Sequence, residues 1–313
     1  MPIHLPPISR RKLLAQSLSA SAGFAALSLV PGSLYSEETT EKRDAANWLL
    51  WSDPHIDKNR ERDNKGTGFY MYKNFIAATK EVIEKKKGAA GIFINGDCAN
   101  QYGLRPDYKV LAELLEPLSK AGFAIHMTMG NHDHRGRFLD VLKDRLPNNK
   151  PRVGRRVGVV EAKDVNWFLL DTLKTVNGTP GAMGKKQLAW LQVELDKRKE
   201  KPAIVMLHHN PKTGKDKKFD GWGLIDTDDL FAAVKPRKHV KAMIFGHTHH
   251  WGLDQVDDIH LINLPALGRI FQKDEPLGWV DATLRSDGMT VELRALDTKH
   301  KAHGDKHDLK WRT

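Results

Sequence analysis

Short apolar runs alternate with longer amphipathic segments from residue 47 onward. Runs of about four to eight apolar residues are typical of buried strands, whereas longer segments with one apolar face are typical of helices. This alternation predicts an α/β domain in which helices cover a sheet. We expect the covering helices at residues 70–87, 108–121, 138–146 and 185–199. The runs at 157–160 and 167–170 predict a hairpin, because polar turn residues lie between them.

Five of the apolar runs lead directly into residues that can bind metals. The segments that follow them are Ser52-Asp53-Pro54-His55, Asn95-Gly96-Asp97, Gly130-Asn131-His132-Asp133, His208-His209-Asn210-Pro211 and Gly246-His247-Thr248-His249. Ligand sites in open α/β sheets lie at the carboxyl edge of the strands. We therefore expect these segments to converge on one pocket.

The last third of the chain has a different pattern. Residues 253–297 contain no obvious long helix, and strands are expected at 260–264, 279–284 and 290–296. This region predicts a second antiparallel part of the sheet, or a second sheet packed on the first. Residues 298–313 are rich in lysine and histidine, including His300, His303 and His307. A solvated tail is favoured there over a histidine-rich metal tract.

The composition is that of a globular protein without disulfides. Of the 313 residues, 40% are hydrophobic and 28% are charged, which is close to ordinary globular usage. One catalytic domain with end segments fits this length. Cys98 is the only cysteine, so stability must come from packing and metal binding. Cys98 itself is expected to be a small buried apolar residue.

The chain is basic, with a formal net charge of +11. Residues 1–36 contribute three positive charges and no negative one, so +8 remains without them. This excess favours anionic partners such as a small phosphorylated substrate, but solvated basic runs such as residues 85–87 favour a generic surface as its main source. No basic motif interleaved with aromatic residues marks a nucleic-acid groove. We therefore expect no specific nucleic-acid partner.

The amino terminus resembles a twin-arginine export signal. Ser9, Arg10 and Arg11 precede an apolar stretch rich in small residues, and residues 1–36 contain no acid. This pattern predicts export to the periplasm or another extracytoplasmic space by the twin-arginine machinery. The stretch is too short and too rich in serine for a stable membrane span in the mature form. The cleavage point and a retained anchor stay open. The expected organisation is a signal and linker at 1–36, a catalytic domain at 45–297 and a basic tail at 298–313.

The strand-end residues suit a pair of metal ions. Two divalent ions about 3.5–4 Å apart can bind a phosphoryl oxygen and generate a hydroxide for in-line attack. Such a pair needs a bridging carboxylate, and Asp97, which follows a glycine, is the best candidate. The remaining candidate ligands are Asp53, His55, Asn131, His208, His247 and His249. Ligands rich in imidazole suit manganese, iron, zinc or cobalt.

Taken in order, these motifs resemble those of the calcineurin-like metallophosphoesterases over about residues 47–265. The resemblance implies a four-layer αββα sandwich, in which two mixed β-sheets are flanked by helices. It also implies that Asp53, His55, Asp97 and His249 hold one ion, and that Asp97, Asn131, His208 and His247 hold the other. The implied reaction is the hydrolysis of a phosphomonoester or phosphodiester by a metal-activated hydroxide.

The resemblance also implies roles for the residues after Asn131. His132 would be the catalytic histidine that protonates the leaving alkoxide, because imidazole exchanges protons near neutral pH. Asp133 would orient His132. The neighbouring His134, His209 and His250 are expected to support the site or to be exposed, and His126 to be packed in a strand.

The chain departs from the protein-phosphatase branch of the family in two places. Cys98-Ala99-Asn100 stands where relatives have further acidic residues or, in that branch, an arginine nearby, and Asp133 stands where that branch usually has glutamate. The chain looks more similar to the small bacterial branch that contains cyclic-nucleotide and glycerophosphodiester phosphodiesterases. Two alternatives are a noncatalytic, metal-stabilised binding protein and a nuclease of the same superfamily. Loops at 57–69, 105–108 and 212–222, with Trp222 at the mouth, are expected to select the substrate.

Overall fold

Two six-stranded sheets carry the site. The computed structural model describes residues 43–63, 70–143, 152–215 and 217–313, all within the unit Glu41–Thr313. The first sheet has the order β12 (Lys306–Lys310), β11 (Gly288–Ala295), β10 (Gly278–Arg285), β1 (Asp44–Ser52), β2 (Ala89–Asn95) and β3 (Ala124–Thr128). The second has the order β4 (Gly158–Glu161), β5 (Asn166–Leu169), β6 (Ala203–Met206), β7 (Val240–Phe245), β9 (Ile259–Asn263) and β8 (Gly252–Val256).

Both sheets are mixed. In the first sheet, β1, β2 and β3 run parallel, while β10 to β12 are antiparallel to their neighbours. In the second sheet, β5, β6, β7 and β9 run parallel, and β4 and β8 pair antiparallel at the edges. The predicted hairpin is confirmed, since β4 pairs with β5. The parallel strands therefore end along one edge of each sheet.

Alternate residues of the strands enter different hydrophobic cores. In β1, Trp51 packs among the helices beside the first sheet, while Leu50 packs between the two sheets. In β7, Ile244 shares the core between the sheets, while Met243 faces the helices on the other side. Successive side chains on a strand point to opposite faces, so the central strands of each sheet are buried on both faces. This double burial explains why the strands read as continuous apolar runs.

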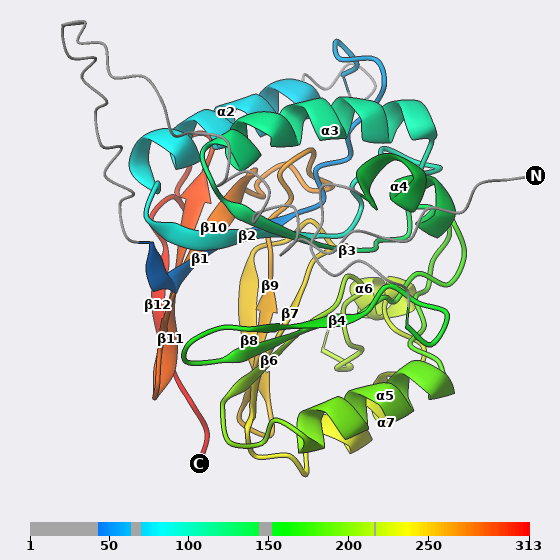
Figure 1. Cartoon of the computed structure of the whole chain (residues 1–313), viewed down its shortest axis with the longest axis vertical. Helices are drawn as coiled ribbons and strands as arrows, with labels where there is room; N and C mark the ends of the chain where they lie inside the picture. The colour runs from blue at the N-terminus through cyan, green and yellow to red at the C-terminus, as the bar shows by residue number, and fades with distance from the viewer. Residues whose placement is uncertain (1–42, 64–69, 144–151, 216) are drawn as a thin grey trace, which may run out of the picture. The chain divides into compact units, whose positions relative to one another are not determined.

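Helices cover the outer face of each sheet, as Figure 1 shows. The helices that pack on the first sheet are α2 (Met71–Lys85), α3 (Arg105–Lys120) and α4 (Arg135–Leu142). Those that pack on the second are α5 (Lys185–Asp196) and α7 (Thr227–Val234), and a short α6 (Lys217–Trp222) precedes α7. The order helix, sheet, sheet, helix confirms the predicted αββα sandwich.

Some element bounds differ from the prediction. Residues 105–108, expected as a substrate loop, form the first turn of α3. Pro106 suits a first helical turn because the amide hydrogen that it lacks has no partner there, and the Asp107 carboxylate accepts from the Leu104 amide at 3.3 Å. The short α7 and β8 were not predicted, because neither carries a long periodic pattern.

Parts of the predictions lie outside the described residues. These are the export signal at 1–36, the end of the loop at 64–69 and the end of a helix at 144–146. Within the described ranges, no helix combines the length and the apolar character needed to cross a bilayer.

The carboxy-terminal segment is part of the first sheet, so the prediction of a solvated tail is wrong for these residues. Lys306–Lys310 forms β12 and pairs with β11. Arg312 then crosses to the second sheet, where its buried guanidinium donates to four backbone carbonyls. These belong to Val234, Arg237, Val240 and Asp257, at 2.8–3.3 Å. The Val234 carbonyl at the end of α7 also accepts from the Arg237 amide at 3.1 Å, so the guanidinium adds a second donor at this helix end.

Replacing Arg312 with methionine should destabilise the protein. Arg312→Met removes all four hydrogen bonds of a buried guanidinium, so we expect the free energy of unfolding to fall by about 3 kcal/mol. Lys310→Met, at the exposed end of β12 two residues earlier, should change it by less than about 0.5 kcal/mol. Urea denaturation followed by tryptophan fluorescence measures both. Equal losses in the two variants would contradict the bridging role of Arg312.

Candidate metal centre at the strand ends

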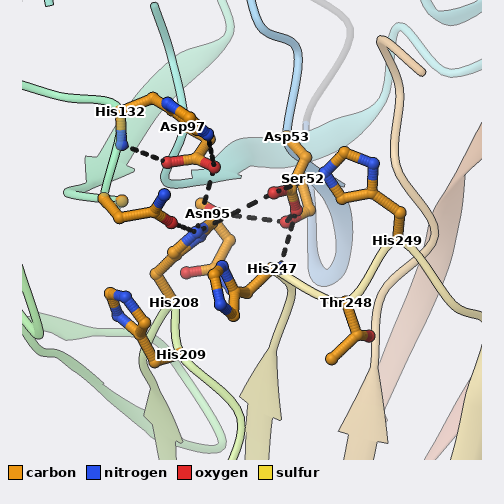
Figure 2. Close-up of polar contacts among 12 residues, drawn as sticks. Ser52, Asp53, Asn95, Asp97, His132, His208, His209, His247, Thr248 and His249 are labelled. Carbon is orange, nitrogen blue, oxygen red and sulfur yellow. Dashed lines mark hydrogen bonds and ion pairs between the residues drawn. The ribbon is translucent and has the colours of Figure 1, made fainter. Parts of the chain in front are cut away.

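The ends of the parallel strands meet where the edges of the two sheets face each other. The Ser52 hydroxyl donates to the carbonyl of Asn95 at 3.0 Å, which joins the ends of β1 and β2. The Asn95 side chain donates to the carbonyl of Leu207 at 2.9 Å and so ties the first sheet to the second. The amide of Gly246 donates to the carbonyl of His208 at 3.1 Å. These bonds hold the polar segments around one space, as Figure 2 shows.

All seven residues predicted as metal ligands lie around this space. The structure gives two buried groups of potential ligands, Asp53 with His55 and His249, and Asp97 with His208 and His247. Asn131 joins the second group, since its side-chain oxygen lies 3.3 Å from Nε2 of His208. A third group contains His55, Asp97 and His132. Asp97 therefore lies between the first group and the second.

The first group points three ligand atoms at one position. Nε2 of His55 and Nε2 of His249 lie 3.0 Å apart. Oδ1 of Asp53 lies 3.3 Å from the His249 nitrogen and 3.8 Å from the His55 nitrogen. Oδ1 also has no hydrogen-bond donor among the described residues, although it is buried. A carboxylate oxygen and two imidazole nitrogens thus face a common point.

The second group is arranged around the other carboxylate. Oδ2 of Asp97 lies 3.3 Å from Nε2 of His208 and 3.7 Å from Nε2 of His55. Nδ1 of His208 lies 3.0 Å from the carbonyl of Asn95. Because a carbonyl only accepts, Nδ1 carries the hydrogen, and Nε2 is left to face the site. His247 lies beside His208, and its Nε2 is buried without a partner in the described part of the chain.

The backbone takes an unusual conformation at these ligands. Asp53, His55, Asp97, His247 and His249 all have positive φ angles, between 46° and 69°. Such angles are uncommon outside glycine, although aspartate and histidine tolerate them better than most residues. Each costs about 1–3 kcal/mol and persists only where the surroundings impose it. The left-handed residues turn the chain sharply at the strand ends, so the side chains do not follow simple strand alternation.

Close contact with Gly130 fixes the position of Asp97. A Cβ atom at Gly130 would lie 2.1 Å from Oδ1 of Asp97. The same oxygen accepts from the amide of His132 at 2.8 Å. Only glycine at this position lets the loop after β3 approach the carboxylate, and Oδ2 is left to face the imidazoles.

The pKa shifts at the site indicate that its buried carboxylates require nearby positive charge. Burial alone would raise the pKa of Asp97, but the imidazoles of His208 and His132 hold that pKa well below its usual value. Burial lowers the pKa of His208, yet the carboxylates of Asp97 and Asp53 raise it to about 10. Without a metal, a proton on His208 therefore neutralises part of the buried negative charge. A metal ion would replace this proton, because metal ligation requires the neutral imidazole.

These observations fit divalent cations. Isolated buried carboxylates are costly unless they are paired or bind metals. Asp53 and Asp97 are both buried, and the atoms around them are oxygens and imidazole nitrogens. Burial and the neighbouring charge of His208 lower the pKa of His247 to about 3, so this imidazole is neutral and ready to bind a metal. Carboxylate and imidazole ligands together suit first-row transition metals.

His132 borders the site but is held differently. Its Nδ1 lies 3.0 Å from the carbonyl of Gln101, and its Nε2 lies 3.9 Å from Oδ2 of Asp97. The His132 side chain is 16% exposed, whereas those of His55 and His208 are fully buried. His132 is therefore within reach of a molecule that enters from solvent.

Asp133 does not orient the His132 ring, and that prediction is wrong. Its carboxylate accepts from the backbone amides of Cys98, Ala99 and Gly130 at 2.9–3.2 Å. It also accepts from the hydroxyl of Tyr108 at 3.0 Å. Asp133 thus joins the loop after β2 to the loop after β3, and the Gln101 carbonyl orients His132 instead.

The neighbouring histidines have separate supporting roles. His209 is buried, and its Nδ1 lies 2.8 Å from the hydroxyl of Thr172. His134 accepts from the amide of Arg137 at 3.3 Å and caps α4. His250 lies 2.5 Å from the Glu275 carboxylate. His126 packs in β3 beside aromatic rings, and Cys98 is buried in the core beside the first sheet, both as predicted.

Aromatic side chains border the site on one side. The ring of Phe271 stacks on the ring of His249, with 3.8 Å between the ring centroids, and Trp222 packs edge-on against Phe271. A cavity of about 240 Å³ lies beside this border, and its lining includes Phe219, Thr248 and His250. The predicted position of Trp222 near the mouth agrees with these contacts. Its role in selecting a substrate stays a prediction.

Sequence reasoning missed Arg269 and Phe271, which come from the segment after β9. Leu267 and Gly268 donate from their amides to the carbonyls of Ser52 and Asp53 at 2.9 and 3.0 Å. This segment therefore lies against the first ligand loop. No local motif or periodicity marks it, and only the contact across the fold shows that it belongs to the site.

Comparison with known proteins agrees with this geometry. The family model described as calcineurin-like phosphoesterase matches residues 46–251. A 3',5'-cyclic adenosine monophosphate phosphodiesterase of Haemophilus influenzae is 26% identical over 250 residues, which cover 77% of this chain and 86% of that protein. A 3',5'-cyclic-nucleotide phosphodiesterase of a Nostoc species is 26% identical over 206 residues, which cover 66% of this chain and 73% of that protein.

A solved structure shares the fold. A dimetal phosphatase from Danio rerio superposes with a TM-score of 0.67 at 14% identity, covering 86% of this chain and 99% of that chain. The family match contains the whole buried cluster of aspartates and histidines. This chain therefore belongs to the calcineurin-like phosphoesterase family and is a hydrolase of phosphoester bonds.

Proposed function

We propose that this chain cleaves a small phosphodiester, of the cyclic-nucleotide class, with two divalent ions. The observation that carries the proposal is that Asp97 lies between two groups of buried ligands. A shared carboxylate is the element that a pair of ions needs. The similarity to two cyclic-nucleotide phosphodiesterases favours a diester over a monoester.

The two ions would share Asp97. Asp53, His55 and His249 would complete the ligands of one ion. Asn131, His208 and His247 would complete those of the other. When bound, the ions would polarise the phosphoryl oxygens and supply a water of lowered pKa as the nucleophile. Manganese, iron, zinc and cobalt all fit these ligands.

His132 would act on the leaving group. The Gln101 carbonyl accepts the hydrogen of Nδ1, so Nε2 is the nitrogen that faces the site. In the protonated ring, Nε2 can donate its proton to the departing alkoxide. The partial exposure of His132 would let a bound substrate reach it. Asp133 would contribute indirectly, by fixing the loops that carry Asp97 and His132.

The cavity beside the site would hold the organic part of the substrate. It opens next to Thr248, which lies between two proposed ligands, and its lining includes the apolar side chains of Phe219, Phe245 and Leu253. Asn210 and Asn263 add polar groups. A mainly apolar wall with a few polar groups suits a small organic ring with hydrogen-bonding edges.

The enzyme would act outside the cytoplasm. The paired Arg10 and Arg11 and the acid-free stretch up to residue 36 support export by the twin-arginine machinery. This route carries folded proteins, which suits an enzyme that acquires its metals before export.

Loss of Asp97 should abolish metal-dependent turnover. With Asp97→Asn, we expect fewer than two ions per chain and a fall of more than about 100-fold in hydrolysis of 3',5'-cyclic AMP and bis-p-nitrophenyl phosphate, because the shared ligand carries the ion pair. Elemental analysis and assays with added manganese, with and without a chelator, measure both effects. Asp196→Asn, at the exposed end of α5, is the control. Chelator-resistant turnover by the wild-type protein would overturn the proposal.

The effect of losing His132 on the rate of hydrolysis should depend on the leaving group of the ester. His132→Ala should retain its metals but slow the cleavage of alkyl and ribose esters by about 10²–10⁴-fold, which is the usual contribution of a general acid. Esters of p-nitrophenol should be affected far less, since p-nitrophenolate leaves without a proton. His134→Ala, at a neighbouring histidine, is the matched control variant. Equal slowing of all esters would refute the general-acid role.

Export should depend on the arginine pair. Replacing Arg10 and Arg11 with lysine should leave the precursor in the cytoplasm of a bacterial host that has the twin-arginine route. Lys12→Gln should not block export. Cell fractionation followed by immunoblotting distinguishes the two outcomes, and normal export of the double variant would rule out this signal.

A further inference from the structure

Arg269 is a largely buried cation beside the metal centre. Its guanidinium makes one hydrogen bond to a described residue, from Nη1 to the Asn100 side-chain oxygen, and at 3.5 Å this bond is weak. Nε is buried and has no partner among the described residues. Within the described ranges, no carboxylate forms an ion pair with Arg269. A guanidinium has five donors, so most of its hydrogen-bonding capacity is unused.

Several other buried or half-buried arginines of the described chain have strong acceptors. Arg312 donates to four carbonyls, as described above. Arg294 pairs with Glu81 and Glu292 at 2.8 and 3.1 Å. Arg135 donates to both oxygens of Asp171. Arg269 differs from these three because no strong acceptor faces it among the described residues. Burying a charge without acceptors is costly, so this guanidinium favours a ligand.

The protein fixes the backbone next to Arg269. The amide of Gly268 donates to the carbonyl of Asp53 at 3.0 Å, and its carbonyl accepts from the Asn74 side chain at 3.0 Å. A Cβ at Gly268 would lie 2.5 Å from the carbonyl oxygen of Pro54. Two residues after Arg269, the Phe271 ring stacks on the ring of His249. The ligand loop itself therefore positions Arg269.

Asn100 fixes the other side of the guanidinium. Its Nδ2 donates to the Asp57 carboxylate at 2.8 Å, and Arg62 donates to the same oxygen. This arrangement turns the amide oxygen of Asn100 toward Arg269. Burial lowers the pKa of Arg269, while the charges of Asp97 and Asp53 raise it, which agrees with a guanidinium that lies close to the cluster.

We propose that Arg269 binds a non-bridging oxygen of the substrate phosphoryl group and holds it against the metal pair. The inference rests on the proposed phosphodiesterase function. With two divalent ions in place, Arg269 adds a third positive centre to the same space. An uncompensated buried charge is costly, so the positive charge in excess of Asp53 and Asp97 favours an anion in this space. A phosphoryl group provides several oxygens for these centres, and guanidinium matches its geometry better than ammonium does.

Phosphate binding tests this role without turnover. We would titrate inorganic phosphate into manganese-loaded protein by calorimetry and measure bound manganese in the same samples. Arg269→Ala should weaken phosphate binding by about 10- to 100-fold, the usual effect of hydrogen bonds to a charged group, with manganese unchanged. Arg269→Lys should weaken it less. Arg60→Met, which removes an exposed arginine paired with Glu113, should have no effect.

Rescue by free guanidinium separates substrate binding from a structural role. Guanidinium chloride below denaturing concentration should restore part of the phosphate affinity of Arg269→Ala and should not affect Arg269→Lys. Unchanged affinity in both variants would overturn the proposal. Loss of manganese in parallel with phosphate would overturn it too, because Arg269 would then act on the centre itself. Hydrolysis by the wild-type protein tests the phosphodiesterase function separately, since phosphate affinity is measured without turnover.

Discussion

Two buried carboxylates, those of Asp53 and Asp97, impose the main constraint on this fold. They lie at the facing edges of the two sheets, where water cannot neutralise them. Buried charges require compensation by partners or metals, and imidazoles from both sheets supply it. In the absence of a metal, this demand holds a proton on His208 by raising its pKa to about 10. The same demand favours divalent cations, and the excess positive charge that they bring favours an anionic substrate.

The sandwich holds strained strand ends in place. Five proposed ligands have positive φ angles, which a free loop would relax. Hydrogen bonds across the fold oppose this relaxation: His55 donates from its amide to the carbonyl of Asp97, and His247 donates from its amide to the Asp53 carboxylate. Asp133 holds the loops after β2 and β3 together. The rigid sheets thus supply a preorganised ligand set, and the more exposed His132 remains available for proton transfer.

Local patterns were enough to predict the central strands, most helices and the residues around the site. Asp53, Asp97 and His208 could be found because each directly follows an apolar run, and the order of the motifs resembles one family. Contacts between distant segments could not be predicted. Arg269 has no motif, and Arg312 lies in a segment whose charge suggested a tail. Left-handed conformations, and bonds such as those of Asp133, depend on a partner loop that no local sequence pattern reveals.

Anomalous diffraction from crystals of the manganese-loaded protein would test most directly whether the two ligand groups hold an ion pair. We predict two peaks about 3.5–4 Å apart, with the Asp97 carboxylate between them. One peak should lie beside Asp53 and His249, and the other beside His208 and His247. A single peak at full manganese loading, or peaks that do not share Asp97, would contradict the dinuclear centre.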